Sequence, residues 1–157
     1  MHEALRWWDR WLKNKNTGVE DDPAYTVYLM DGVKPKTSYK YRNGHWISFQ
    51  DWPKQSSNKT LYLSDKSELA EEKTSINKMI SSPQTCGLDS GEYCAIWLGP
   101  ELPGDQRIDD AQSACFTTGE LSNQLDIVGA PKVKLKLRSS TCTAQIAVRL
   151  NHIHPDG

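Results

Sequence analysis

Two segments in the C-terminal half carry apolar residues at alternate positions, strictly so in the first, and this pattern constrains the fold most. Residues 132–138 read KVKLKLR, and residues 144–150 read AQIAVRL. A period of two puts alternate side chains on opposite faces of a β-strand, so each segment predicts a strand with one buried face. Residues 113–117 and 121–128 predict two more strands. Several short strands with one apolar face each predict a mainly-β fold, a β-sandwich of the jelly-roll type.

The N-terminal half begins with a short helix and continues with turn-separated strands. Residues 3–13 place apolar side chains at helical spacing, with charged residues on the other side, and predict an amphipathic helix. Aromatic and β-branched runs at 25–30, 45–49 and 60–63 predict strands. Residues 74–112 have no clear period and predict an ordered crossover. We therefore expect a terminal helix segment at 1–18 and one β-sandwich domain at 19–157.

Charge and hydropathy exclude several classes of protein. The chain has 19 basic and 20 acidic residues and a formal net charge of -1, which argues against a nucleic-acid footprint or a polybasic membrane patch. No apolar run approaches the roughly 20 residues that a membrane-spanning helix needs. The N-terminus has no basic region followed by an apolar run, so the sequence predicts no signal peptide and only slightly favours the cytoplasm.

The cysteines and histidines give weak signals for a disulfide or a metal. Cys86 and Cys94 are close enough in sequence to bridge a short loop, or they are free thiols that behave as small apolar residues. Four scattered histidines and no CxxC pairs disfavour zinc. His152 and His154 would share one face of an extended chain, but no third ligand is nearby in sequence. We expect no metal and no cofactor.

A charged loop is the most site-like stretch of the sequence. It holds Asp105, Arg107, Asp109 and Asp110 within six residues. The spacing does not match a calcium loop, and a carboxylate pair for glycoside hydrolysis requires a geometry that sequence does not give. We therefore expect a structural loop in which Arg107 is tied to neighbouring carboxylates and joins two halves of the domain.

No nucleophile is recognisable, and exposed aromatics offer the remaining ligand site. No serine lies in a Gly-x-Ser-x-Gly turn, and the glycines form no phosphate-binding loop. Trp46, Trp52 and Trp97, with Tyr93, are candidates for a platform that stacks on sugars or small ligands. The alternative is that these aromatics fill the sandwich core or a domain interface.

A series of short motifs resembles one family of serine hydrolases over nearly the whole chain. The pieces are WDRWLK at 8–13, GV at 18–19, VYLMDG at 27–32, Trp46, WP at 52–53, TLYL at 60–63, LPGDQR at 102–107, LDIVGAP at 125–131, VRL at 148–150 and PDG at 155–157. In this order they resemble the C-terminal part of the X-Pro dipeptidyl-peptidase, cocaine esterase and α-amino-acid ester hydrolase family.

The resemblance implies a longer protein with a catalytic domain and a separate β domain. Family members carry an α/β-hydrolase domain with a Ser-Asp-His triad, followed by a jelly-roll domain similar to galactose-binding folds. The helix at 8–13 resembles the end of the hydrolase part, and every triad residue would fall before Met1. The family's jelly roll also continues beyond the PDG motif. We therefore expect a sandwich that is incomplete at both ends and has no hydrolase activity of its own.

The expected partner is the hydrolase domain of a full-length parent or a second copy of the chain. In the parent, the sandwich would pack on the hydrolase domain and help shape access for X-Pro peptides, esters or amides. Two alternatives stay open. One is a stand-alone module that binds carbohydrates or small ligands, and the other is a homo-oligomerising structural protein whose unpaired strand edges meet in a second copy.

Overall fold

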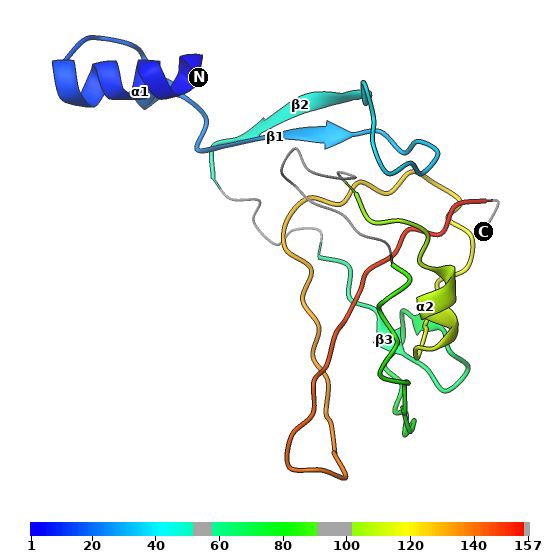
Figure 1. Ribbon diagram of the computed structural model, residues 1–157. Helices are drawn as coiled ribbons and strands as arrows, with labels where there is room; N and C mark the ends of the chain where they lie inside the picture. Colours follow the sequence, from blue (N-terminus) through cyan, green and yellow to red (C-terminus); the bar gives the residue numbers. More distant parts are fainter. Residues whose placement is uncertain (52–57, 91–101, 156–157) are drawn as a thin grey trace. The chain divides into compact units, whose positions relative to one another are not determined.

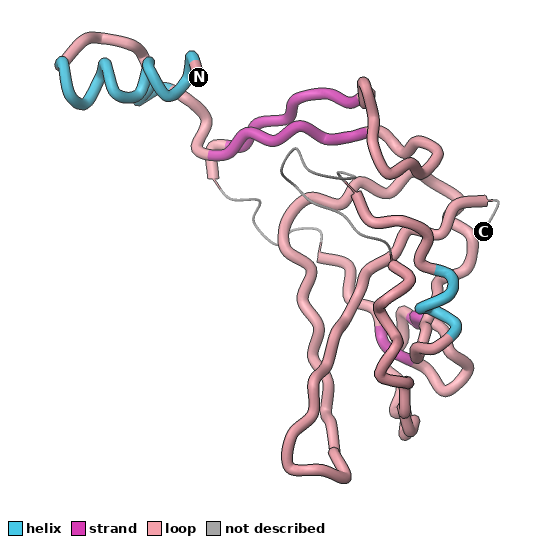
Figure 2. Tube along the Cα trace, in the orientation of Figure 1, coloured by secondary structure: helices cyan, strands magenta, loops and turns pink. Residues whose placement is uncertain are grey.

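The computed structural model describes residues 1–51, 58–90 and 102–155 (Figure 1). Two helices, a 3₁₀ turn and four strands occur in these residues, in the order α1 (His2–Lys13), η1 (Val19–Asp21), β1 (Tyr25–Met30), β2 (Gly44–Phe49), β3 (Tyr62–Leu63), β4 (Leu69–Ala70) and α2 (Arg107–Ala111). The strands form two antiparallel pairs, and Figure 2 shows the loops that join them. Small antiparallel sheets with few helices confirm the mainly-β class, while the jelly-roll arrangement stays a prediction.

The chain divides into two compact units. Unit 1 contains Met1–Met30 and Asn43–Asn58, and unit 2 contains Asp31–Arg42 and Lys59–Gly157. Unit 1 holds α1, β1 and β2, whereas unit 2 holds β3, β4 and α2. The predicted boundary at residue 18 stays a prediction. Among the described residues, no helix is long and apolar enough to cross a membrane.

Helix α1 forms where its amphipathic pattern predicts. It ends at Asn14, which adopts a left-handed conformation with φ 52°, a conformation that asparagine tolerates better than most residues. On the polar side, Arg6 pairs with Asp22 and Arg10 pairs with Glu20. The segment that follows the helix is therefore held against its charged face.

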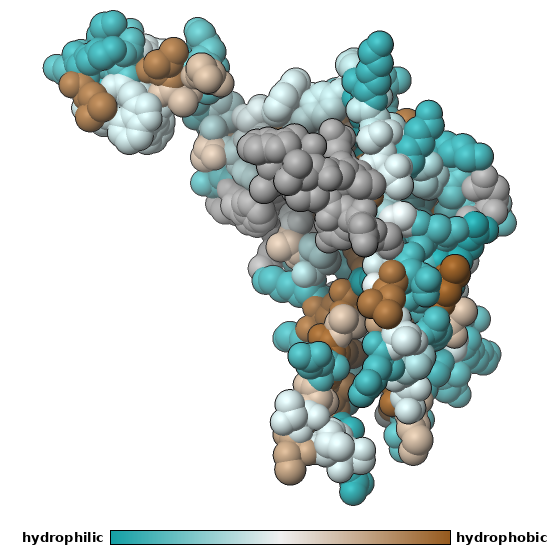
Figure 3. All heavy atoms as spheres, viewed as in Figure 1, coloured by the Kyte–Doolittle hydropathy of each residue, from teal (hydrophilic) through white to brown (hydrophobic). Residues whose placement is uncertain are grey.

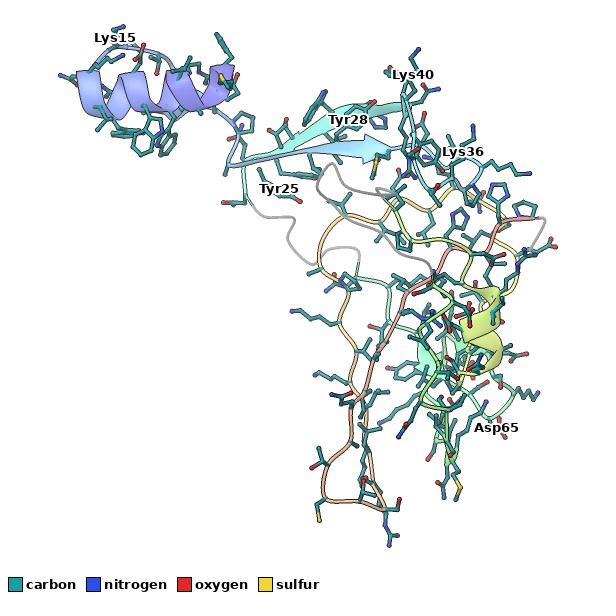
Figure 4. The ribbon with its side chains drawn as sticks, viewed as in Figure 1. Lys15, Tyr25, Tyr28, Lys36, Lys40 and Asp65 are labelled. Carbon is teal, nitrogen blue, oxygen red and sulfur yellow. The ribbon has the colours of Figure 1, made fainter. Side chains whose placement is uncertain are left out.

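The strand pair β1–β2 confirms the strands predicted at 25–30 and 45–49. The pair is antiparallel, and its register runs from Tyr25 opposite Phe49 to Met30 opposite Gly44. On this pair, the Tyr28 and Trp46 rings lie edge to face with their centroids 5.2 Å apart. Figure 4 labels Tyr25 and Tyr28 on β1. Aromatic cross-strand contacts of this kind stabilise an isolated hairpin.

Unit 2 contains a smaller β structure than the sequence predicts. The strand expected at 60–63 is reduced to the two residues of β3, which pair with β4. The strand expected at 113–117 contributes one bridge, in which Thr117 accepts a hydrogen bond from the Leu69 amide at 2.8 Å and donates one to Ser67 O at 3.1 Å. Thr117 therefore adds a third chain beside β4.

The strands predicted at 121–128, 132–138 and 144–150 are wrong as regular strands. The described structure assigns no strand there, and no backbone hydrogen bond joins these three segments. Figure 1 shows 132–138 running outward in orange and 144–150 returning in red. Alternation in sequence fixes which side chains share a face, but a strand also needs a neighbour whose backbone pairs with it.

Apolar side chains remain at the surface of both units. Among the described residues no hydrophobic side chain is buried, and Val133, Leu135 and Ile146 are 56%, 41% and 55% exposed. Figure 3 shows apolar side chains on the visible surface of each unit. Contiguous exposed apolar surface marks sites where a protein meets a partner. The faces that the sequence predicts to be buried are thus available for contact.

Candidate functional site

The most densely bonded polar cluster of the described residues lies around α2. Three segments of unit 2 meet there: the turn at 86–90, the helix with its flanking loop at 104–113, and the extended chain at 149–151. The charged loop predicted from sequence forms the middle segment. The sequence therefore locates part of this cluster but not its partners.

Asp109 is the centre of the cluster. It is 0% exposed, and its Oδ1 accepts a hydrogen bond from the Gly87 amide at 2.6 Å. Its Oδ2 has no hydrogen-bond partner among the described residues, and Arg149 Nη1 lies 4.0 Å from it. A buried carboxylate is costly unless a cation or hydrogen bonds compensate it. Asp109 therefore depends on Arg149 for charge compensation.

Arg149 joins the end of the extended chain to α2. Its Nη1 donates to Gln106 Oε1 at 2.7 Å, and its Nη2 donates to Asp110 Oδ1 at 2.6 Å. The side-chain amide of Asn151 also donates hydrogen bonds from Nδ2 to Asp110 Oδ1 at 3.1 Å and to Asp110 Oδ2 at 3.0 Å. We call Gln106, Asp109, Asp110, Arg149 and Asn151 the Arg149 clamp. Charge-assisted bonds of this kind are stronger than neutral ones and hold geometry well.

The turn at 86–90 is hydrogen-bonded to the segment 104–113 that carries part of the Arg149 clamp. The Gln106 side chain donates to Ser90 O at 3.2 Å, and the Gly104 amide donates to the same oxygen at 2.8 Å. Cys86 Sγ lies 3.3 Å from Ser113 Oγ, and Ser113 Oγ donates to Asp109 O at 2.7 Å. Most polar atoms of the cluster are thus engaged in structural bonds.

Arg107 and Asp105 form a separate, local pair. Arg107 Nη2 lies 2.5 Å from Asp105 Oδ2, and the two side chains are 67% and 54% exposed. The hydrogen bond from Arg107 holds the pKa of the Asp105 carboxyl below its usual value. Arg149 joins the segments at 104–113 and 149–151 through its bonds to Gln106 and Asp110. The structural role predicted for Arg107 stays a prediction.

The cluster offers structure rather than catalytic chemistry. Cys86 is a free thiol in the described structure, and Cys94, with which a disulfide was one of two alternatives, lies outside the described residues. No group of three metal-ligating side chains occurs in the part of the chain that the structure describes. The hydroxyl and thiol of the cluster have no histidine among their described contacts. Asp109 and Asp110 serve the Arg149 clamp.

The aromatic candidates are only partly placed. Trp46 lies on β2 and is 68% exposed. Trp52, Tyr93 and Trp97 lie outside the described residues, so the predicted stacking platform stays a prediction. Arg149 and Asn151 were not predicted as site residues. Their shared face, set by a spacing of two in an extended chain, was the only sequence signal for them.

Unit 2 also has a surface groove. It has a volume of about 430 Å³, and its apolar lining consists of Leu61, Leu69, Leu121 and Leu125. At its edge, Lys59 Nζ lies 2.9 Å from Glu71 Oε1. The other residues that line the groove are polar, charged or glycine, so the groove is of mixed character.

Comparison with protein families shows which family the chain belongs to. A family model described as the X-Pro dipeptidyl-peptidase C-terminal non-catalytic domain matches residues 17–157. The chain belongs to this family. No curated protein and no solved structure gives a significant match.

Membership of the X-Pro dipeptidyl-peptidase C-terminal domain family confirms the resemblance seen in the sequence. The family's description as non-catalytic confirms the expectation that this chain has no hydrolase activity of its own. A domain of this description accompanies a catalytic hydrolase domain in a parent peptidase. The match begins at residue 17, so α1 lies outside it.

Proposed function

We propose that this chain docks on the catalytic domain of a serine hydrolase that acts on X-Pro peptides, esters or amides, and helps shape substrate access there. The observation that carries the proposal is the exposed apolar face of α1. Leu5, Trp8, Trp11 and Leu12 lie on it and are 60%, 53%, 53% and 73% exposed. Tryptophan is the residue most enriched among those that dominate binding energy at protein interfaces.

The charged face of α1 is already occupied by the chain itself. Arg6 and Arg10 hold Asp22 and Glu20, and Lys13 Nζ lies 2.5 Å from Asp9 Oδ1. The Trp7 and Trp11 rings lie next to each other with their centroids 5.6 Å apart, and the Arg10 guanidinium carbon lies 5.4 Å from the centroid of the Trp11 ring. A partner therefore meets exposed aromatic side chains on a helix whose charged residues already have ion-pair partners within the chain.

Two single substitutions, one of a tryptophan on α1 and one of a tryptophan on β2, test the docking surface. The partner is the catalytic domain of an X-Pro dipeptidyl-peptidase expressed without its own C-terminal domain and without its counterpart of α1, and calorimetry measures the affinity. Trp8→Ala should weaken binding by roughly 30-fold or more, because interface tryptophans cost about 2 kcal/mol or more on truncation. Trp46→Ala, which removes an exposed tryptophan from β2, is the matched control and should leave the affinity unchanged.

Two results would contradict the docking proposal. One is the absence of any complex with the catalytic domain. The other is an equal loss of affinity in both tryptophan variants, because that would not distinguish α1 from the rest of the surface. A separate assay of the purified chain with X-Pro amides and simple esters should show no turnover above that of a buffer control.

A carbohydrate or small-ligand module is the second candidate, and the exposure of Trp46 favours it. An exposed indole beside the Tyr28 ring offers an aromatic surface for a sugar face. Binding on a glycan array that Trp46→Ala abolishes and Trp8→Ala preserves would support this function. An array without binding would count against it and leave docking as the function that the chain supports.

A further inference from the structure

Four basic side chains alternate with apolar ones along the segment 132–138. They are Lys132, Lys134, Lys136 and Arg138, and all four are exposed. None of them has an ion pair or a hydrogen bond among the described residues. Figure 1 shows the segment in orange as an extended trace. Alternate residues of an extended chain lie about 6.6–6.8 Å apart on one face, so the four charges form a row about 20 Å long. We call this row the basic strip.

The same segment has an apolar face and an unpaired backbone. Val133, Leu135 and Leu137 alternate with the basic strip, and all three are exposed. Among the described residues, no backbone hydrogen bond joins 132–138 to another segment. An extended chain whose backbone N–H and C=O groups lack a neighbour is a template for an added strand. A second strand would therefore meet free backbone groups, a row of apolar side chains and a row of positive charges.

The chain itself supplies no acidic row that matches the basic strip. The next alternating segment, 144–150, carries Gln145, Ala147 and Arg149 on its more polar face, and none of these is acidic. A second copy of 132–138 would set basic residues opposite basic residues, and like charges destabilise a cross-strand pair. The occupant with complementary charge is therefore a strand of another protein that carries acidic residues at alternate positions.

We propose that the segment 132–138 binds an extended acidic peptide by strand addition. In a peptide whose acidic and apolar residues alternate, the carboxylates repeat with the same step as the basic strip, so four of them face the four cations. The apolar residues of the peptide then cover the apolar row on the other face. Main-chain hydrogen bonds provide affinity in this mode of recognition, and the alternate side chains provide specificity. This surface is independent of the docking function proposed for α1.

Calorimetry of the full chain with a synthetic peptide tests the proposal. The probe is a peptide with blocked ends in which four glutamates alternate with valines, and one equivalent should bind. A scrambled peptide of the same composition, in which the glutamates do not alternate, should bind more weakly, because its carboxylates leave on both faces of the strand. Heparin, a sulfated polysaccharide, tests whether the basic strip recognises negative charge alone.

Substitution of the central lysines of the basic strip locates the binding surface. Lys134→Ala combined with Lys136→Ala should weaken binding of the alternating peptide by about 2- to 30-fold, the range expected for the loss of two cross-strand pairs of opposite charge. Lys134→Glu with Lys136→Glu should reverse the preference, toward a peptide in which lysines replace the glutamates. The matched control is Lys66→Ala with Lys73→Ala, which removes two exposed lysines elsewhere in unit 2 and should leave the affinity unchanged.

Amide exchange at Gly87 checks that each variant keeps the Arg149 clamp. The absence of binding by the unchanged chain would overturn the proposal. So would equal affinity for the scrambled peptide, or tighter binding of heparin than of the alternating peptide, because either result would mean that the basic strip attracts anions without adding a strand. An equal loss of affinity in the Lys66 and Lys73 control would show that net charge, rather than the basic strip, determines binding.

Discussion

Removal of Arg149 should loosen the whole cluster around α2. In Arg149→Ala the Asp110 carboxylate loses its cationic partner, Gln106 loses a donor, and the fully buried Asp109 loses the nearest compensating charge. The structure thus predicts a larger effect here than at any other arginine of unit 2 whose contacts are described. A large effect on stability is what a structural clamp, rather than a catalytic cluster, requires.

The size of this effect follows from burial. Hydrogen bonds to charged groups contribute about 1.5–3 kcal/mol, and removal of one partner from a buried ion pair costs about 3–5 kcal/mol. The Arg149 and Asp110 side chains are 31% and 30% exposed, whereas Asp109 is 0% exposed. Partial exposure places the expected loss at about 2–3 kcal/mol, toward the lower of the two ranges.

Hydrogen exchange at the Gly87 amide measures this loss locally. That amide donates to Asp109 Oδ1 at 2.6 Å, so it exchanges when the cluster opens. A loss of about 2–3 kcal/mol corresponds to a fall in protection of roughly 30- to 150-fold. Arg149→Lys should give an intermediate value, because lysine keeps the charge but cannot reach two acceptors with a planar fork.

Arg138→Ala is the matched control for this experiment. Arg138 lies at the end of the 132–138 segment and has no ion pair among the described residues, so its removal should leave the Gly87 exchange rate unchanged. Unchanged protection in Arg149→Ala would refute the reasoning. An equal loss in Arg107→Ala would transfer the clamp to Arg107, as the sequence alone suggested.

Two further predictions concern the Asp105–Arg107 pair and Gly44. The hydrogen bond from Arg107 depresses the pKa of Asp105, so its stabilising effect is present above the pKa of the unfolded chain and is lost as pH falls through the folded pKa. Arg107→Met should raise the Asp105 pKa toward its usual value in an NMR titration; an unchanged pKa would mean that another group causes the shift. In Gly44→Ala, the added Cβ would overlap the Leu29 carbonyl oxygen and approach the Tyr28 ring to 2.8 Å, so the β1–β2 pair should lose about 1–3 kcal/mol. Gly32→Ala, which meets no atom within 4 Å, is the control. Urea unfolding of both alanine variants is monitored by tryptophan fluorescence. Equal midpoints for the two variants would contradict the observed β1–β2 register.

Features fixed by local interactions were predictable from the sequence. The helix at 3–13 was predicted because its apolar residues recur at helical spacing and Asn14 can adopt the left-handed conformation that ends it. The strands β1 and β2 were predicted because aromatic and β-branched residues favour strands, whereas their antiparallel pairing is a finding of the structure. In both cases the residues that determine the element also contact each other.

Features that need distant partners were not predictable. The alternation at 132–138 and 144–150 specifies two faces, but no described backbone pairs with either segment, so neither becomes a regular strand. Likewise, the charged loop at 105–110 was visible as a cluster, but its ion pair with Arg149 spans 39 residues. The face that Arg149 shares with Asn151 does not by itself distinguish it from the other basic residues of polar strand faces.

Hydroxyl-radical footprinting of the chain with the catalytic domain tests the central claim most directly. The method reports the solvent exposure of individual tryptophan side chains, and the chain carries described tryptophans both on α1 and on β2. If α1 is the docking surface, oxidation of Trp7, Trp8 and Trp11 should fall on complex formation, while oxidation of Trp46 stays constant. Unchanged oxidation of the α1 tryptophans in a complex that has formed, or protection of Trp46 alone, would contradict docking through α1.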